Sequence, residues 1–105
     1  MKIVYIAHPI GGYVDGNLED LRRIIKHINL TMPDIVPYCP YYADVVSLCD
    51  NTPAERKRGM DNGIMTLGLA HEVWLCGDRI SEGMRTEIDH AETLGIPLIN
   101  KIGKI

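Results

Sequence analysis

Glu87 is the residue of this sequence best placed to do chemistry. Glu87 is the last residue of a glycine-containing segment, residues 77–87. This segment follows the apolar, strand-like run at residues 73–76 and leads into a predicted helix. A helix beginning near Ser81 would have an apolar stripe of four residues: Met84, Ile88, Ala91 and Leu94. At 100° per residue Glu87 falls inside this stripe, and near the positive end of the helix dipole it is expected to stay ionised. An ionised carboxylate held in position is suited to act as a nucleophile.

A second candidate segment follows the apolar run at residues 4–7, and it consists of His8, Pro9, Ile10, Gly11 and Gly12. Its paired glycines would let backbone N–H groups approach a phosphate or a sugar. A tight turn between a strand and a helix explains the same residues equally well. Because neither the dinucleotide fingerprint nor the Walker A lysine pattern is present, the segment argues against a standard NAD or ATP site.

The other polar residues that could belong to a functional site can also be explained by ordinary structural roles. Asp61 borders the apolar face of a predicted helix and could reach the same crevice, but a surface aspartate paired with Arg58 fits the spacing as well. Of the four scattered histidines, His8 alone is placed to matter. Since no HExxH or paired spacing occurs, no metal site is predicted.

The composition limits the classes of function. The chain has 105 residues, of which 46% are hydrophobic, and a formal net charge of −3, so no basic surface for a nucleic acid polymer is expected. No run of about 18 apolar residues occurs, and the short N-terminal apolar run predicts a buried strand instead of a signal peptide. The odd number of cysteines, without CxxC spacing, argues against disulfides and structural zinc and favours the cytoplasm.

The first half of the chain predicts a strand, a helix and a second strand. After residues 4–7, Asn17 is expected to cap a helix whose apolar residues follow a 3.6-residue period: Leu18, Leu21, Ile25 and Ile28. Pro33 and Asp34 break the chain before a short strand at residues 35–36. Residues 37–51 are predicted to form a long irregular loop.

In the second half, Thr52, Pro53 and Glu55 combine an N-cap, a proline at the first helical position and a capping-box glutamate. This predicted helix has one apolar face formed by Met60, Ile64 and Leu67. A third strand at about residues 72–76, the helix that carries Glu87, and a helix stop with a fourth strand at residues 95–99 follow.

Regular alternation of strands and helices predicts an α/β fold with right-handed crossovers. We expect one domain over residues 1–105, a Rossmann-like or flavodoxin-like three-layer sandwich with a mostly parallel sheet of about four or five strands. Ligands bind at the carboxyl ends of the strands in such sheets. If strands one and three are adjacent, the two glycine loops flank the same crevice.

Nearly the whole chain resembles the nucleoside 2-deoxyribosyltransferase superfamily, including its nucleoside 5'-monophosphate N-glycosidase branch and small phage and bacterial relatives. The resemblance is carried by a first strand ending in Tyr5 before a glycine loop, and by Ser81-x-Gly83-x-Arg85-x-Glu87. It implies that Glu87 attacks C1' of the sugar while the base leaves, and that water or another base resolves the glycosyl-enzyme. Asp61 is then expected to support catalysis.

The resemblance also implies a small-molecule nucleoside or nucleotide partner, no cofactor and no metal, and a homodimer or larger homo-oligomer whose subunits share residues in the site. Ser81 is expected to hold a 5'-phosphate or a ribose oxygen. The full set of expected substrate-binding residues is Tyr5, His8, Pro9, Ile10, Gly11, Gly12, Asp78, Ser81, Gly83 and Met84.

The chain departs from the family pattern at three positions. Arg85 replaces the second motif glycine, Ile10 stands where the monophosphate-hydrolysing branch has an arginine, and His8 stands at the position of its phosphate-binding serine. Arg79 or Arg85 could supply positive charge instead. Three readings therefore stay open: N-glycosidic bond cleavage or base exchange at Glu87, a binding domain that senses or sequesters a nucleotide-derived ligand, and a structural interaction module in which the helix dipole stabilises Glu87.

Overall fold

The computed structural model describes residues 1–105 and has an α/β architecture. The elements in chain order are β1 (Lys2–Ala7), α1 (Val14–Thr31), β2 (Ile35–Tyr38), α2 (Tyr41–Ser47), α3 (Pro53–Leu67), β3 (Glu72–Leu75), α4 (Glu82–Leu94) and β4 (Leu98–Asn100). The strands form one parallel sheet in the order β2-β1-β3-β4. This confirms the predicted fold class, and the strand order places the first and third strands side by side.

The sheet is centred on β1, whose residues from Val4 to Ala7 are fully or almost fully buried. A strand buried on both faces must be apolar throughout, as this one is. Tyr5 pairs with Tyr38 of β2, and Ala7 pairs with Leu75 of β3. The ends of β1 and β3 therefore lie side by side, and the loops that follow them start together.

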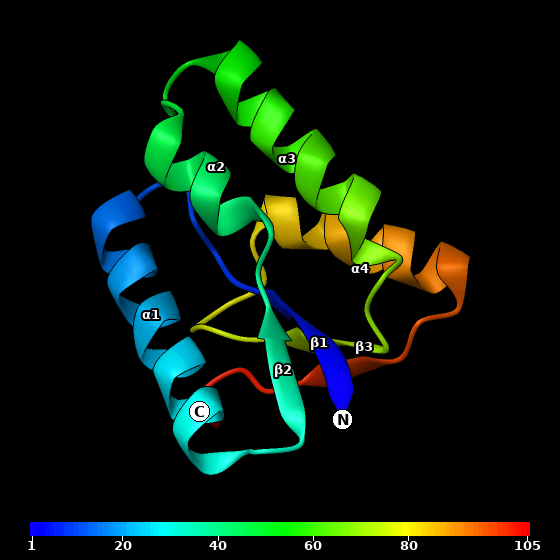
Figure 1. Ribbon diagram of the computed structural model, residues 1–105. Coiled ribbons are helices and arrows are strands. Elements are labelled where there is room, and N and C mark those ends of the chain that lie inside the picture. The colour runs from blue at the N-terminus through cyan, green and yellow to red at the C-terminus, as the bar shows by residue number, and fades with distance from the viewer.

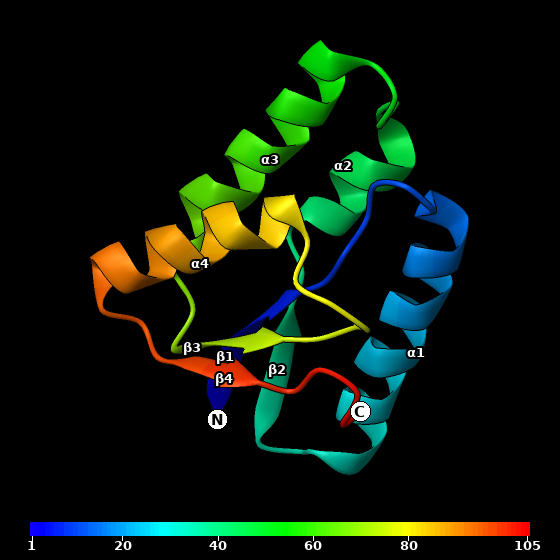
Figure 2. The same ribbon diagram turned by 180° about the vertical axis from the view of Figure 1, so that it is seen from behind.

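Helices cover both faces of the sheet (Figures 1 and 2). Right-handed crossovers place α1 on one face, and α3 and α4 pack against each other over the opposite face. The buried stripe of α1 consists of Leu18, Leu21, Ile24 and Ile28. The C-terminal tail lies on the α1 side, where Arg23 donates a hydrogen bond to the Ile105 carbonyl oxygen over 2.8 Å.

Three local predictions were wrong. Helix α1 begins at Val14 with Tyr13 as its N-cap, so Asn17 lies inside the helix and its side-chain amide donates to the Ile10 carbonyl. The segment predicted to be irregular contains α2, a short helix. Helix α3 does begin after Thr52, but its capping box is absent: Glu55 accepts a hydrogen bond from the Cys49 backbone N–H instead.

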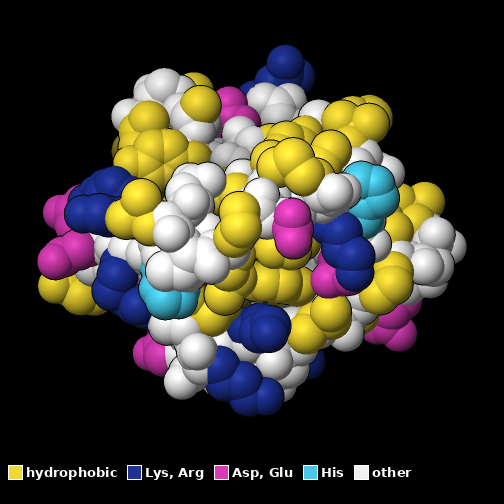
Figure 3. Space-filling view, turned by 60° about the horizontal axis from the view of Figure 1, so that its bottom comes forward, with side chains coloured by type: hydrophobic (Ala, Val, Ile, Leu, Met, Phe, Trp, Pro, Cys, Tyr) yellow, Lys and Arg dark blue, Asp and Glu magenta, His cyan; other side chains and the backbone are white.

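The side of the molecule on which the strands begin is shown in Figure 3. Hydrophobic side chains gather near its middle, and acidic and basic side chains are mixed around them. This face therefore carries no broad field of one sign. None of the helices has the length and apolar character that crossing a membrane requires.

Candidate active site

A cavity of about 430 Å³ opens at the carboxyl ends of β1 and β3. Its walls come from the loops after β1 and before α4, from the first turns of α4, and from α2 and α3. The volume is within the range of small-molecule sites, and the place is where open α/β sheets bind ligands. The predicted meeting of the two glycine loops at one crevice is confirmed.

Glu87 and Tyr5 form the chemical centre of this cavity. The Tyr5 hydroxyl, at the end of a side chain from the middle of β1, donates a hydrogen bond to Glu87 Oε2. Burial and the neighbouring carboxylate raise the pKa of Tyr5 well above its ordinary value, so the phenol stays protonated and acts as the donor. The pair thus fixes one oxygen of a carboxyl group that lines the cavity.

The Tyr5 ring is itself fixed by two aromatic neighbours. Its centroid lies 6.3 Å from that of Tyr38 in an edge-on arrangement and 5.9 Å from that of Tyr41. The Tyr41 hydroxyl donates to the Ile6 carbonyl oxygen over 2.6 Å. Because each ring is held by packing or a hydrogen bond, the donor to Glu87 has little freedom to move.

The ionisation of Glu87 differs from the prediction. Burial raises its pKa from 4.5 to about 7, although the hydrogen bond from Tyr5 acts in the opposite direction. Glu87 lies in the second turn of α4, and the helix dipole acts mainly within the first turn. Desolvation therefore outweighs the dipole, and near neutral pH the carboxyl group is divided between its two protonation states.

Glycines on α3 let this helix approach the centre. A Cβ atom built on Gly63 would lie 3.1 Å from the Tyr5 hydroxyl oxygen, and one on Gly59 would lie 3.3 Å from the Asp44 Cβ. Both positions are one turn apart and face the cavity. A larger residue at either position would push α3 away from Tyr5 or α2.

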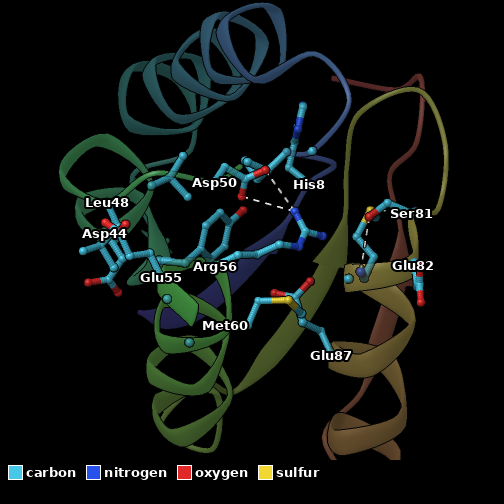
Figure 4. Close-up of a pocket in the computed structure, with 18 of the residues that line it drawn as sticks. His8, Asp44, Leu48, Asp50, Glu55, Arg56, Met60, Ser81, Glu82 and Glu87 are labelled. Carbon is cyan, nitrogen blue, oxygen red and sulfur yellow. Dashed lines mark hydrogen bonds and ion pairs between the residues drawn. The ribbon is translucent and has the colours of Figure 1, made fainter. Parts of the chain in front are cut away.

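An ion pair between Arg56 and Asp50 faces Glu87 across the cavity (Figure 4). Arg56 Nη1 lies 3.0 and 3.2 Å from the two carboxylate oxygens of Asp50. Gly11 is in close contact with this group, because a Cβ atom there would lie 2.8 Å from Arg56 Nη1. The absence of a side chain at position 11 thus leaves room for the guanidinium group.

His8 lines the cavity, but both of its ring nitrogens are engaged. Nδ1 lies 2.7 Å from the Pro9 carbonyl oxygen, and Nε2 lies 2.7 Å from Asp20 Oδ2. Burial alone would raise the pKa of Asp20, but the hydrogen bonds from His8 and Arg23 outweigh it and lower the pKa. His8 therefore ties the loop after β1 to α1 and presents no free nitrogen to a ligand.

Ser81 lies at the N-terminus of α4, on the rim of the cavity. Its hydroxyl oxygen accepts a hydrogen bond from the Met84 backbone N–H over 3.3 Å, which makes Ser81 the N-cap. The predicted start of this helix is confirmed. A Cβ atom on Gly83 would lie 3.5 Å from Met60 Cε, so this glycine is where α4 meets α3.

Most residues expected in the site line the cavity: Tyr5, His8, Ile10, Gly11, Gly12, Ser81, Gly83, Met84 and Glu87. Pro9 is buried beneath the loop, and Asp78 is exposed and paired with Arg79. Asp61 is also exposed and paired with Lys57 over 2.6 Å, and it does not line this cavity. The structure therefore does not bring Asp61 together with Glu87.

The contribution of α2 and the first half of α3 to the cavity was not predicted from the sequence. Helix α2 brings Asp44 to the cavity, the loop between α2 and α3 brings Asp50, and α3 brings Glu55 and Arg56. The missed signal was a helical one, since Arg56, Gly59, Met60 and Gly63 recur at the spacing of one face. Because residues 37–51 were predicted to form a loop, helix α2 was not expected, and the face of α3 that shares the cavity with α2 was not recognised.

Comparison with known proteins agrees with this architecture. The fold is similar to that of a solved 2-deoxyribosyltransferase from the psychrotolerant bacterium Bacillus psychrosaccharolyticus, with a TM-score of 0.66 and 17% sequence identity. The match covers 98% of this chain and 75% of the transferase, and at this identity it establishes a relationship of fold. No curated protein matches the sequence. Residues 2–101 match a domain family described as "Domain of unknown function (DUF7768)", and the chain belongs to this family.

Proposed function

We propose that this protein cleaves or exchanges the N-glycosidic bond of a nucleoside, with Glu87 as the nucleophile. The observation that carries the proposal is a carboxyl group lining a ligand-sized cavity with one oxygen held by the Tyr5 hydroxyl. A raised pKa at a cavity carboxyl is common in functional sites. The fold shared with a 2-deoxyribosyltransferase is consistent with this reaction.

The proposed reaction is a double displacement. The free oxygen of ionised Glu87 forms a bond to C1' of the sugar, and the bond between C1' and the base nitrogen breaks with its electron pair on the base. Water or a second base then attacks C1' and releases Glu87. Tyr5 holds the other carboxylate oxygen, which restricts the rotation of the nucleophile.

The test is base release from a panel of deoxyribonucleosides, ribonucleosides and their 5'-monophosphates, followed by chromatography. Wild-type protein is expected to release the base from at least one nucleoside, and Glu87→Gln is expected to release it about a thousandfold more slowly or not at all. Glu92→Gln is the matched control, because Glu92 is an exposed residue of the same helix outside the cavity. Equal base release by Glu87→Gln and wild type would exclude the proposed nucleophile.

Tyr5→Phe is expected to move the acid limb of the pH profile of kcat/KM upward by about one pH unit. A hydrogen bond to a charged group contributes about 1.5 to 3 kcal/mol, and the bond from Tyr5 lowers the pKa of Glu87. The nucleophile must be ionised, so activity near pH 7 should fall about fivefold and recover above pH 8. Tyr38→Phe is the control, since Tyr38 packs on Tyr5 without bonding to Glu87. A loss that is equal at every pH would contradict this role.

The partial protonation of Glu87 near neutral pH favours one alternative, a domain that binds a nucleoside-derived ligand without cleaving it. A protonated carboxyl group donates hydrogen bonds but is a poor nucleophile. This alternative predicts that a panel member raises the melting temperature of wild-type protein while no base is released. Arg85, the departure from the motif, is exposed and outside the cavity lining, so it does not obstruct either function.

A further inference from the structure

The cavity is strongly acidic. Five carboxyl groups line it, from Asp44, Asp50, Glu55, Glu82 and Glu87, whereas Arg56 is its one lysine or arginine side chain. Arg56 is already paired with Asp50. The remaining four carboxyl groups have no cationic partner. Asp44, Glu55 and Glu82, together with the ionised fraction of Glu87, therefore make the charge that a ligand meets in this cavity negative.

Three of these four carboxyl groups accept hydrogen bonds, and each donor is neutral. The Asn62 amide donates to Asp44 over 3.4 Å, the Cys49 backbone N–H donates to Glu55 over 3.2 Å, and Tyr5 donates to Glu87. Such bonds orient a carboxylate and leave its charge in place. The cavity is therefore built to hold uncompensated negative charge beside a ligand.

A 5'-phosphate fits this cavity poorly. It would add negative charge beside the four carboxyl groups and would compete with Asp50 for Arg56. The two arginines near α4 do not help, since Arg79 is paired with Asp78 and neither Arg79 nor Arg85 lines the cavity.

The departure of a neutral base needs a proton, and the tyrosine hydroxyls and the imidazole of the cavity are engaged, while the aliphatic hydroxyl of Ser81 is too weak an acid to supply one. The Tyr5 hydroxyl donates to Glu87, the Tyr41 hydroxyl donates to the Ile6 carbonyl, and both nitrogens of His8 are bonded. A base that is already cationic needs no proton, because the electron pair of the broken bond neutralises its ring nitrogen.

We propose that the cavity selects nucleosides whose base carries a fixed positive charge, such as an N-glycosylated pyridinium ring or an N7-alkylated purine. The inference rests on the proposed function and names its substrate class. In the reaction, a Glu87 oxygen forms a bond to C1' and the C1'–N bond breaks, releasing a neutral base. Water then attacks C1' and the bond between C1' and Glu87 breaks, which restores the carboxylate; the water oxygen stays on the sugar and one proton passes to solvent. The acidic lining stabilises the cationic ground state and the positive charge that develops at C1'.

The first test is binding to Glu87→Gln, which separates recognition from the lability of the substrate. Calorimetry would compare N7-methylguanosine with guanosine, nicotinamide riboside with its neutral 1,4-dihydropyridine form, and nicotinamide riboside with nicotinamide mononucleotide, which adds only the 5'-phosphate. The cationic nucleosides are expected to bind about tenfold more tightly than their matched partners at low salt, with a smaller difference at high salt. Equal binding within each pair, or tighter binding of the mononucleotide, would overturn the inference.

Charge-neutralising variants identify the source of the preference. Glu55→Gln and Glu82→Gln, each combined with Glu87→Gln, are expected to weaken binding of N7-methylguanosine several-fold and to leave guanosine unchanged. Glu92→Gln, outside the cavity, is the matched control. If the cavity variants affect both ligands alike, the acidic lining is not what discriminates. The proposed function fails separately, when wild-type protein releases no base from any nucleoside.

Discussion

Glu87→Gln is expected to stabilise the folded protein at pH 8 while it lowers base release by about three orders of magnitude or more. The folded-state pKa of Glu87 is about 7 and the ordinary value is 4.5. The folded protein therefore binds the proton more tightly than the unfolded chain, and ionisation of Glu87 disfavours folding. Glutamine keeps an oxygen that can accept the Tyr5 hydrogen bond and removes the charge.

The sign of the pH dependence follows from these two values. Below pH 4.5 the carboxyl group is protonated in both the folded and the unfolded state, so its ionisation does not change the free energy of unfolding. As pH rises from 4.5 to 7 the unfolded chain ionises first, so wild-type stability falls, and above pH 7 the loss is complete at about 3 kcal/mol. The advantage of Glu87→Gln should thus be below about 1 kcal/mol at pH 5 and largest at pH 8.

Urea unfolding at pH 5, 6.5 and 8 measures this effect, with Glu92→Gln as the matched control. The control is expected to follow wild type at every pH, because Glu92 is exposed. A Glu87→Gln variant whose advantage is the same at pH 5 and pH 8 would show that burial does not raise the pKa of Glu87. Such a combination of lost activity and gained stability is typical of a group retained for function.

The order of strands and helices could be predicted because each signal is local. Apolar runs marked the buried strands, Gly95 marked the end of α4 with a left-handed backbone, and Ser81 marked its start. Parallel topology then required the two glycine loops to follow neighbouring strands. The inward orientation of Glu87 came from helical periodicity, and the cavity lining agrees with it.

The features that could not be predicted depend on contacts between segments distant in sequence. Asp61 and Gly63 are both close to the apolar residues of α3, and the docking angle of this helix decides which of them faces Tyr5. The pKa of Glu87 depends on how completely α3 and β1 exclude water from it. Helix α2 was missed because Pro37 and Pro40 suggested a break, although Pro40 is the N-cap of that helix.

Gly77→Ala is expected to destabilise the protein by about 2 to 4 kcal/mol, because two costs coincide at this position. Gly77 has a φ of +92°, a conformation that alanine rarely adopts. A Cβ atom there would also lie 2.7 Å from Pro9 Cδ and 3.2 Å from His8 Nε2. The proline ring is rigid and His8 is held by Asp20, so neither neighbour can move away easily.

Gly12→Ala is the matched control for this contact. Gly12 has a φ of +90°, and a Cβ atom there meets nothing within 4 Å, so this variant carries the backbone cost alone, about 1 kcal/mol. The difference in unfolding free energy between the two variants therefore measures the close contact between the loop after β3 and the loop after β1. If the two variants lose equal stability, that contact does not hold the loops together. If Gly77→Ala loses more, the same contact also fixes the two loops beside the cavity that Glu87 lines.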